Sequence, residues 1–345
     1  GDDIGHEIVT AAVRVARAAA DRHGVAIDWR PVPIGRSALD AHGSTMPEGT
    51  LETLASLDGF VLGPIGHQAY PKTPGAINPH PILRKHFDLF ANVRPTRSYK
   101  DIGCIYDDID LVIVRENNEG FQPDRNVVAG SGEFRPSDEM TISVRVISRT
   151  GSRKVARAAL ELARSRRKKL TLVHKNTVFK LGCGMFVEEC YKAAADFPDV
   201  TVDEVIVDTF AMRLIRDPQT FDTVVTTNMF GDILSDLTAE LSGSLGLGGS
   251  LNAGRDHAMG QAAHGSAPDI AGKDIANPFS LILSAAQLLA WHGQRRGLPS
   301  FAAASQAIEQ ACADAVQTGE ATRDVGGRLG TAETGKALVR RLLAA

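Results

Sequence analysis

The chain has 345 residues, of which 43% are hydrophobic and 23% are charged, and its formal net charge is −3. These values indicate a globular chain that is long enough for two domains or for one large domain. The near-neutral charge argues against a general nucleic-acid binder and against a protein that attaches to membrane surfaces.

Neither the apolar runs nor the cysteines suggest a membrane or secreted protein. No run of about 18 apolar residues occurs, so no transmembrane span is expected. The opening GDDIGHEIV lacks the basic and apolar regions of a signal peptide. The four cysteines show no C-x-x-C spacing, which favours reduced thiols in a cytoplasmic protein.

The first residues, GDDIG, are typical of a turn that leads from a strand into a helix. A helix is predicted over about Glu7–Ala20, but no strand precedes the turn. We therefore expect either a truncated sequence or a missing edge element, and we favour truncation.

Short apolar runs alternate with helical stretches along the rest of the chain. Strands are predicted at Gly59–Leu62, Ile109–Val114, Leu170–His174, Val202–Asp208 and Phe221–Thr227. Helices are predicted at Ser152–Arg166 and from Asn277-Pro278 to Gly293. In the second helix, Asn277 is the capping residue, Pro278 is the first helical residue and Gly293 ends the helix. Alternation of this kind predicts an α/β protein with a largely parallel sheet.

The stretch NMFGDILSDL follows the predicted strand that ends at Thr227. A helix that begins at Gly231 would place Asp232 and Asp236 on one face, at the mouth of the strand. Open α/β sheets bind ligands at such strand ends, and paired carboxylates suit a hard divalent cation. The simpler alternative is a first helical turn in which acids favour the helix dipole.

Further chemistry-bearing side chains lie near strand ends. Single arginines usually form surface salt bridges, but Arg84, Arg94 and Arg115 together can clamp a substrate that has several carboxylates. Lys175 directly follows one strand, and Asp208 ends another. A lysine in an apolar, partly desolvated site can act as a base, although a surface lysine is the commoner case.

The loop HGSAPDIAGKDIANP contains one histidine and an acid, Asp269, that we expect to be buried. No G-x-G-x-x-G follows the first strand, so the usual dinucleotide fingerprint is absent. The glycines of Gly246–Gly249 predict a turn.

Five motifs in this order, GDDIGHEIV, FANVRP, VREN, NMFGDILSDL and HGSAPDIAGKDIANP, resemble the metal-dependent β-decarboxylating dehydrogenases. That family contains 3-isopropylmalate, isocitrate, homoisocitrate and tartrate dehydrogenases, and the resemblance runs from residue 1 to about residue 335. It implies two α/β domains with a central cleft, a cofactor site that is not of the Rossmann type, and a homodimer with shared active sites. The cofactor domain would comprise residues 1–88 and 243–345, and residues 89–242 would form an inserted domain for substrate, metal and dimerisation.

The resemblance also assigns roles to individual residues. The residues that match the family's substrate-carboxylate ligands are Arg84, Arg94 and Arg115. The residues that match its ligands of Mg²⁺ or Mn²⁺ are Asp232 and Asp236 from one subunit and Asp208 from the other. Lys175 matches the catalytic lysine that is contributed across the dimer. His264 corresponds to the residue along the adenine, Asp269 to the acid on the ribose hydroxyls and Asn277 to an adenine contact, with further cofactor contacts expected at Gly265, Ser266, Ala267 and Ile270. Because the Asp269 carboxylate would repel a 2′-phosphate, the expected cofactor is NAD.

The implied reaction is the oxidation of a (2R,3S)-type 3-substituted malate, such as 3-isopropylmalate or isocitrate, followed by loss of CO₂. Gln122 stands where the family has a tyrosine that protonates the product, and Asn176-Thr177 replace the usual x-Asn after the lysine. Asn78 and His80 predict a pocket for a small or polar 3-substituent. Two alternatives stay open: a tartrate- or malate-type dehydrogenase that decarboxylates weakly, and a non-catalytic regulatory subunit.

Overall fold

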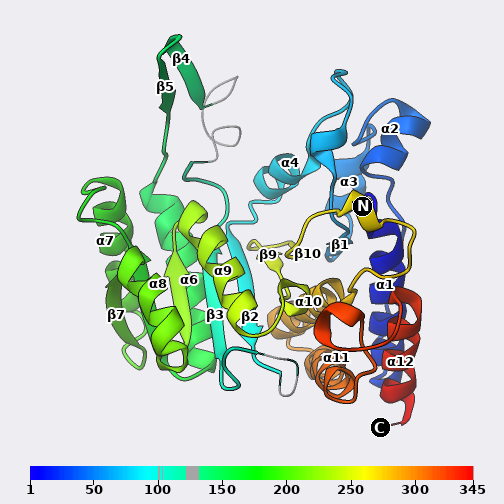
Figure 1. Cartoon of the computed structure of the whole chain (residues 1–345). Helices are drawn as coiled ribbons and strands as arrows, with labels where there is room; N and C mark the ends of the chain where they lie inside the picture. The colour runs from blue at the N-terminus through cyan, green and yellow to red at the C-terminus, as the bar shows by residue number, and fades with distance from the viewer. Residues whose placement is uncertain (100–101, 103, 122–131, 345) are drawn as a thin grey trace.

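An eight-stranded sheet runs through the whole molecule in the computed structural model, which describes residues 1–99, 102, 104–121 and 132–344 (Figure 1). Its strands are β1 (Phe60–Leu62), β2 (Ala91–Arg97), β3 (Asp110–Glu116), β6 (Lys169–His174), β7 (Thr201–Ile206), β8 (Thr223–Thr226), β9 (Leu251–Ala253) and β10 (Ala258–Gln261). The strand order is β1-β10-β9-β2-β3-β8-β6-β7. Within the described residues, the pairs β1–β10, β3–β8, β8–β6 and β6–β7 are parallel, and the three pairs that link β10, β9, β2 and β3 are antiparallel. The predicted α/β class with a mostly parallel sheet is confirmed.

Helices cover both parts of this sheet. They are α1 (Gly5–Arg22), α2 (Arg36–His42), α3 (Thr50–Ala55), α4 (Pro79–His86), α6 (Arg149–Ser165), α7 (Gly182–Ala194), α8 (Val207–Arg216), α9 (Asn228–Leu241), α10 (Phe279–Arg296), α11 (Pro299–Gln317) and α12 (Thr331–Ala344). In Figure 1, α6 to α9 pack around β3 and β7, whereas α1, α10, α11 and α12 gather on the side of β1, β9 and β10. None of the helices in the described part of the chain has both the length and the apolar character that a membrane crossing requires. The division into two domains stays a prediction.

Three predicted boundaries are wrong. The strand that was expected to end at Asp208 ends at Ile206, and Asp208 lies in the first turn of α8. Helix α9 begins at Asn228 and not at Gly231, because the amide of Gly231 already donates to the carbonyl of Thr227 at 2.9 Å.

Gly293 does not end α10, which continues to Arg296 and stops at Gly297 in the left-handed conformation, with φ of 67°. A Cβ atom at Gly293 would lie only 2.7 Å from the Cβ of Phe301. This glycine therefore permits close packing of α10 on α11, and Gly297 is the residue that closes the helix.

A separate two-stranded hairpin projects from the body of the molecule at the top of Figure 1. It consists of β4 (Glu133–Ser137) and β5 (Met140–Ser143), and every residue of both strands is exposed. Phe134 and Met140 are 53% and 54% exposed. A two-stranded hairpin is at most marginally stable alone in water, and exposed apolar side chains of this size are typical of contact surfaces.

Candidate functional site

The topology gathers the predicted residues at one edge of the sheet. Strands β3, β8, β6 and β7 are parallel, so their carboxyl ends lie at the same edge. Arg115 lies near the end of β3, α9 follows β8, Lys175 follows β6, and Asp208 lies in the helix that follows β7. The carboxyl ends of parallel strands are where α/β proteins place their ligands.

Two arginines and two aspartates form the centre of this edge. The Nη2 of Arg94 lies 3.4 Å from the Oδ1 of Asp232, and its Nη1 lies 3.2 Å from the Oδ1 of Asp236. Arg115 also pairs with the Oδ1 of Asp232. The arginine side chains are 10% and 4% exposed, whereas those of the aspartates are 47% and 53% exposed. The predicted shared face of the two aspartates is therefore confirmed, with arginines behind and solvent in front.

Neutral side chains fix the two guanidinium groups. Asn92 accepts a hydrogen bond from the Nε of Arg94 at 2.6 Å, and the Oγ of Ser235 accepts one from its Nη1 at 2.7 Å. The Oδ1 of Asn228 accepts from both Nε and Nη2 of Arg115, at 3.1 and 2.7 Å. Sequence reasoning missed these three residues, although two of them lie within NMFGDILSDL. Asn228 lies four positions before Asp232, and Ser235 lies one position before Asp236.

Helix α9 lies unusually close to β3. A Cβ at Gly231 would lie 2.6 Å from the Cβ of Arg115, so only glycine permits this approach. The proximity also affects the acids, because partial burial raises the pKa of Asp236 and the neighbouring Asp232 carboxylate raises it further, against the opposing effect of Arg94. Burial and Asp232 thus act on the charge of Asp236 in the opposite direction to the two arginines.

Lys175 and Asp208 form a second, more exposed pair. The lysine Nζ lies 2.6 Å from the Oδ1 of Asp208, and their side chains are 27% and 66% exposed. This hydrogen bond lowers the pKa of Asp208. Among the described residues, no three His, Cys, Asp or Glu side chains are grouped so that they can hold a metal ion. Asp208 therefore does not join Asp232 and Asp236 within one chain.

The predicted substrate residues on α4 lie near the strand β10. Arg84 is buried, with 8% exposure. Asn78 caps α4, because its Oδ1 accepts the amide of His80 at 3.1 Å. The Nε2 of His80 lies 2.5 Å from the Nε2 of Gln261, a residue that sequence reasoning missed. This contact joins the predicted substrate helix to the strand that precedes the predicted cofactor loop. Gln122 lies outside the described residues.

The predicted cofactor loop presents its acid to solvent. Asp269 lies in a one-turn 3₁₀ helix (Pro268–Ile270) and is exposed, so the expectation that it is buried is wrong. Small and apolar neighbours suggested burial, but Ala267 and Ile270 pack against the core whereas Asp269 faces solvent. Ala267 adopts a left-handed conformation with φ of 42°, and Ser266 is buried, with its carbonyl accepting the amide of Ile4 at 3.2 Å. Gly265 is exposed and Ile270 is half-buried.

The two predicted adenine contacts share an acidic neighbour. Asn277 donates from Nδ2 to the Oδ2 of Asp324 at 2.8 Å, and its Oδ1 accepts the amide of Phe279 at 2.9 Å. Burial lowers the pKa of His264, and the charge of Asp324 opposes that shift. The histidine is therefore favoured in its neutral form. Asp324 carries no local sequence signal, since it is 47 residues from Asn277.

Comparisons with known proteins cover almost the whole chain. The sequence profile of the family described as isocitrate/isopropylmalate dehydrogenase matches residues 1–338. A 3-isopropylmalate dehydrogenase from Methanothermobacter thermautotrophicus is 37% identical over 343 residues, which cover 99% of this chain and 96% of that protein. An isocitrate/homoisocitrate dehydrogenase from Thermus thermophilus is 39% identical with the same coverage. The crystal structure of isocitrate dehydrogenase from Methylococcus capsulatus superposes with a TM-score of 0.86 at 38% identity, covering 99% of this chain and 97% of that one.

Proposed function

The chain belongs to the isocitrate/isopropylmalate dehydrogenase family, and we propose that it catalyses the NAD-dependent oxidative decarboxylation of a 3-substituted malate. The observation that carries the proposal is the pair of buried arginines that faces two half-exposed aspartates at the carboxyl edge of the sheet. The relatives named above act on 3-isopropylmalate and on isocitrate or homoisocitrate, which share a malate core. The chemistry of the site supports the same class of substrate here.

The arginines are suited to bind the carboxylates of a malate core. A guanidinium pairs with a carboxylate through two parallel hydrogen bonds, and burial strengthens that attraction. Arg94 and Arg115 are held in place by neutral acceptors, so they are oriented before a substrate arrives. In this proposal the third cation is Arg84, which lies in α4, the helix that precedes β2.

The two aspartates of α9 fit a divalent cation such as Mg²⁺ or Mn²⁺. Carboxylate oxygens are the ligands that these ions prefer, and both groups are open to solvent while facing the same side of one helix. When bound, the cation would stabilise the negative charge that develops on the substrate oxygens. Among the described residues no third His, Cys, Asp or Glu is grouped with them to hold a metal ion, so in this proposal the third carboxylate, Asp208, comes from another copy of the chain.

A homodimer supplies the missing groups in this proposal. Lys175 and Asp208 of one copy would enter the site of the other, where the lysine takes the proton of the substrate hydroxyl. Support comes from the exposed apolar side chains of α8 and α9, since Met212, Ile215 and Ile233 are 54%, 56% and 61% exposed. The projecting β4–β5 hairpin offers a second apolar contact. Apolar patches of this kind mark interfaces between protein chains.

Mixed dimers test the shared site directly. One variant carries Lys175→Met and another carries Asp232→Asn, and each alone is expected to be inactive. After unfolding and refolding together, half of the dimers are mixed and each mixed dimer has one intact site, so about a quarter of the wild-type activity should return. Activity that stays at the level of the single variants would show that both groups act within one chain.

The exposed acid of the loop supports NAD over NADP. A carboxylate accepts hydrogen bonds from the ribose diol but repels a 2′-phosphate. Asp269 is exposed on its turn, where a ribose can reach it. Initial rates with both cofactors, for the wild type and for Asp269→Ser, test this choice. The variant should lose preference for NAD, and an unchanged ratio would remove Asp269 from cofactor selection.

The polar side chains on α4 favour a small or polar substituent at C3 of the substrate. The side-chain nitrogens of His80 and Gln261 would line the pocket for this substituent. A large apolar substituent would gain little binding energy beside such polar groups. Steady-state kinetics on 3-isopropylmalate, isocitrate, homoisocitrate, tartrate and malate, each with and without Mn²⁺, test both the reaction and the substrate. A clear preference for 3-isopropylmalate would contradict the polar pocket, and no metal-dependent NADH from the purified chain would favour a regulatory subunit.

Gln122 favours a second candidate, a dehydrogenase that decarboxylates weakly. Glutamine has no proton to donate at a useful pKa, whereas the tyrosine that the family has at this position does. The ratio of CO₂ to NADH separates the two candidates. Gln122→Tyr should raise that ratio in a weak decarboxylase, and an unchanged ratio would exclude a role for this position in protonation.

A further inference from the structure

The strand β6 ends in a buried polar side chain, His174, directly before Lys175. His174 is only 2% exposed. Because successive side chains of a strand point to opposite faces, His174 shares a face with Leu170 and Leu172. Both leucines pack into the core that β6 shares with α6 and α7. An imidazole at the end of such an apolar row needs partners for its ring nitrogens, since an unpaired buried polar group is costly.

The two ring nitrogens of His174 have different neighbours. Nδ1 accepts a hydrogen bond from the amide of Asn176 at 3.3 Å. Nε2 lies 2.9 Å from the Oε2 of Glu204 on β7, which is close enough for an ion pair but is not aligned for a full hydrogen bond. A carboxylate at that distance favours a hydrogen on Nε2, and a neutral ring of that form leaves Nδ1 free to accept. The surroundings therefore favour the tautomer that the Asn176 contact requires.

Glu204 is itself held by α7. The hydroxyl of Tyr191 donates to the Oε1 of Glu204 at 2.8 Å. Partial desolvation and the Glu204 carboxylate raise the pKa of Tyr191 to about 12, so the phenol keeps its proton and remains a donor. A chain of contacts thus runs from Tyr191 through Glu204 and His174 to the amide of Asn176.

These contacts end on the peptide group that follows Lys175. The carbonyl of this group accepts the amide of Phe179 at 2.9 Å, and its N–H is the Asn176 amide that His174 accepts. The peptide group before the lysine is held as well, because the Lys175 amide lies 3.5 Å from the Sγ of Cys183. The backbone of Lys175 is therefore fixed on both sides, although its side chain extends to the surface.

We propose that His174 is a positioning residue for Lys175. Through Nδ1 it fixes the peptide group that follows the lysine, and so it sets the direction in which the lysine side chain leaves the edge of the sheet. The ring itself contacts neither substrate nor cofactor. This inference rests on the catalytic role proposed above for Lys175. Its expected effect is large for a remote group, because a displacement of about 1 Å in a reacting group can lower a rate by about 10²-fold.

Two substitutions separate the contacts of the ring. Asparagine can place its oxygen where Nδ1 lies, whereas glutamine reaches the place of Nε2 and leaves the Asn176 amide without its acceptor. His174→Gln should lower kcat by about 10-fold with both KM values within about 2-fold of the wild type. His174→Asn should keep kcat within about 3-fold. Both variants lose the ring from the core, so their Tm values should fall by similar amounts. Equal kcat in the two variants would overturn the proposal.

Hydrogen exchange tests the same contact without the dehydrogenase assay. The Asn176 amide should exchange with deuterium faster in His174→Gln than in His174→Asn, and equal exchange would overturn the proposal. A wild type that forms no NADH would refute the proposed function, whereas the exchange comparison would still decide the role of His174. If His174→Gln does not fold, ¹⁵N NMR of the wild-type ring decides instead. A hydrogen on Nε2 supports the proposal, and a hydrogen on Nδ1 overturns it, because that nitrogen could then not accept an amide.

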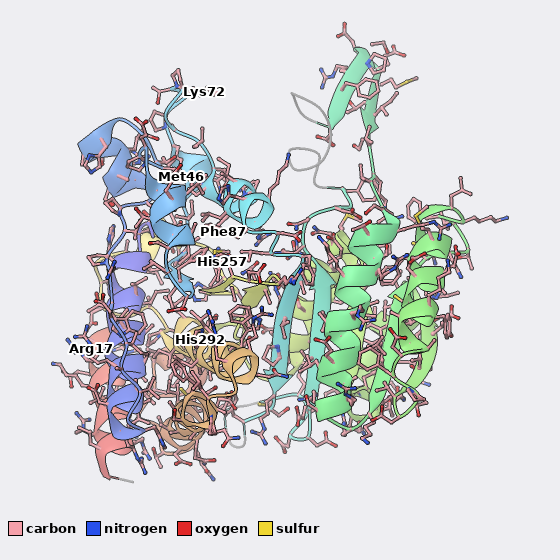
Figure 2. The ribbon with its side chains drawn as sticks, turned by 180° about the vertical axis from the view of Figure 1, so that it is seen from behind. Arg17, Met46, Lys72, Phe87, His257 and His292 are labelled. Carbon is pink, nitrogen blue, oxygen red and sulfur yellow. The ribbon has the colours of Figure 1, made fainter. Side chains whose placement is uncertain are left out.

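His292→Gln is the control for the loss of a histidine ring. Figure 2 labels His292 on α10, which lies on the side of β1, β9 and β10 and away from α7 (Figure 1). Its ring packs against Phe301, with 4.9 Å between the ring centroids. This variant should keep the kcat and the Asn176 exchange rate of the wild type. A decrease in kcat equal to that of His174→Gln would show a general effect of histidine loss and would overturn the proposal.

Discussion

Two acid–base clusters at the same sheet edge differ in how completely one chain builds them. Arg94 and Arg115 are at most 10% exposed, and each has several oriented partners. Lys175 and Asp208 have each other, and the aspartate is 66% exposed. The first cluster is fixed by packing, whereas the second stands on the surface.

In the dimer proposed above, the difference would decide which part of the site each copy of the chain completes before assembly. A buried guanidinium has to be satisfied within its own chain, because an unpaired buried charge is costly. An exposed lysine keeps water as a partner, so it tolerates a temporary ion pair that is worth little. In the proposed dimer, the same chain would present a preorganised arginine–aspartate cluster to one site and the exposed Lys175–Asp208 pair to the other.

The largest effect is expected from Asp232→Asn, which removes a charge that contacts both Arg94 and Arg115. Activity should fall by roughly 10³-fold, because the proposed metal ligand and the partner of two arginines are lost together. The free energy of unfolding should fall by about 1–3 kcal/mol, since the buried Arg115 loses its charged partner while half of the aspartate is already hydrated. Kinetics and urea denaturation measure the two losses.

Asp256→Asn is the control for this change, because Asp256 is 72% exposed and forms only surface ion pairs. Both its activity and its stability should match the wild type. Equal losses in the two variants would mean that the buried cluster has no special role.

Lys175→Met comes next, with an expected loss of activity of about 10²- to 10³-fold and almost no loss of stability. The pair with Asp208 is too exposed to stabilise the fold by more than about 0.5 kcal/mol. Lys169→Met is a matched control, since Lys169 begins the strand β6 that Lys175 directly follows, and its Nζ lies 3.4 Å from the Oδ2 of Asp203. A comparable decrease in Tm for both variants, with activity retained in Lys175→Met, would remove the lysine from catalysis.

Local spacing predicted the centre of the site because one helix carries it. Asp232 and Asp236 are four residues apart, so any helix places them together, whichever residue begins it. The three-residue error in the start of α9 therefore did not matter. Arg115 was predicted for a similar reason, since a residue at the end of a buried apolar run lies at the edge of the sheet.

Contacts that depend on strand register or on solvent were beyond sequence reasoning. Asn92 lies opposite Arg115 in the β2–β3 ladder, a pairing that no short motif encodes. The contact between His80 and Gln261 joins residues 181 positions apart. Asp269 was expected to be buried because its neighbours are apolar, but exposure depends on how the whole turn is oriented.

Asn228→Ala sharpens the comparison within the buried cluster itself. The change removes the acceptor of two hydrogen bonds from Arg115 and leaves its charged partner Asp232 in place. The arginine should bind substrate less well, so KM should rise by about 10-fold while kcat falls less. Ser244→Ala, which removes a hydroxyl that accepts the Gly246 amide, should leave both constants unchanged. A decrease in kcat alone would place Asn228 in the chemical step.

The smallest effect on activity is expected from Glu116→Gln, behind the arginine cluster. Burial raises the pKa of Glu116 to about 7, although its oxygens accept the amides of Asn118 and Glu119 at 2.7 and 2.8 Å. Because the folded state holds this proton more tightly than the unfolded state, the stability that protonation contributes is present below about pH 4.5 and is lost as pH rises through about 7.

The wild type should therefore lose up to about 3 kcal/mol of unfolding free energy from this group between about pH 4.5 and pH 8. Glu116→Gln cannot titrate, so its unfolding free energy should depend less on pH over that range. Urea denaturation at several pH values measures both slopes. Glu240→Gln, on the exposed side of α9, should keep the wild-type slope. If Glu116→Gln also kept it, the carboxyl behind Arg115 would be charged throughout, and the buried half of the site would be as well solvated as the Lys175–Asp208 pair.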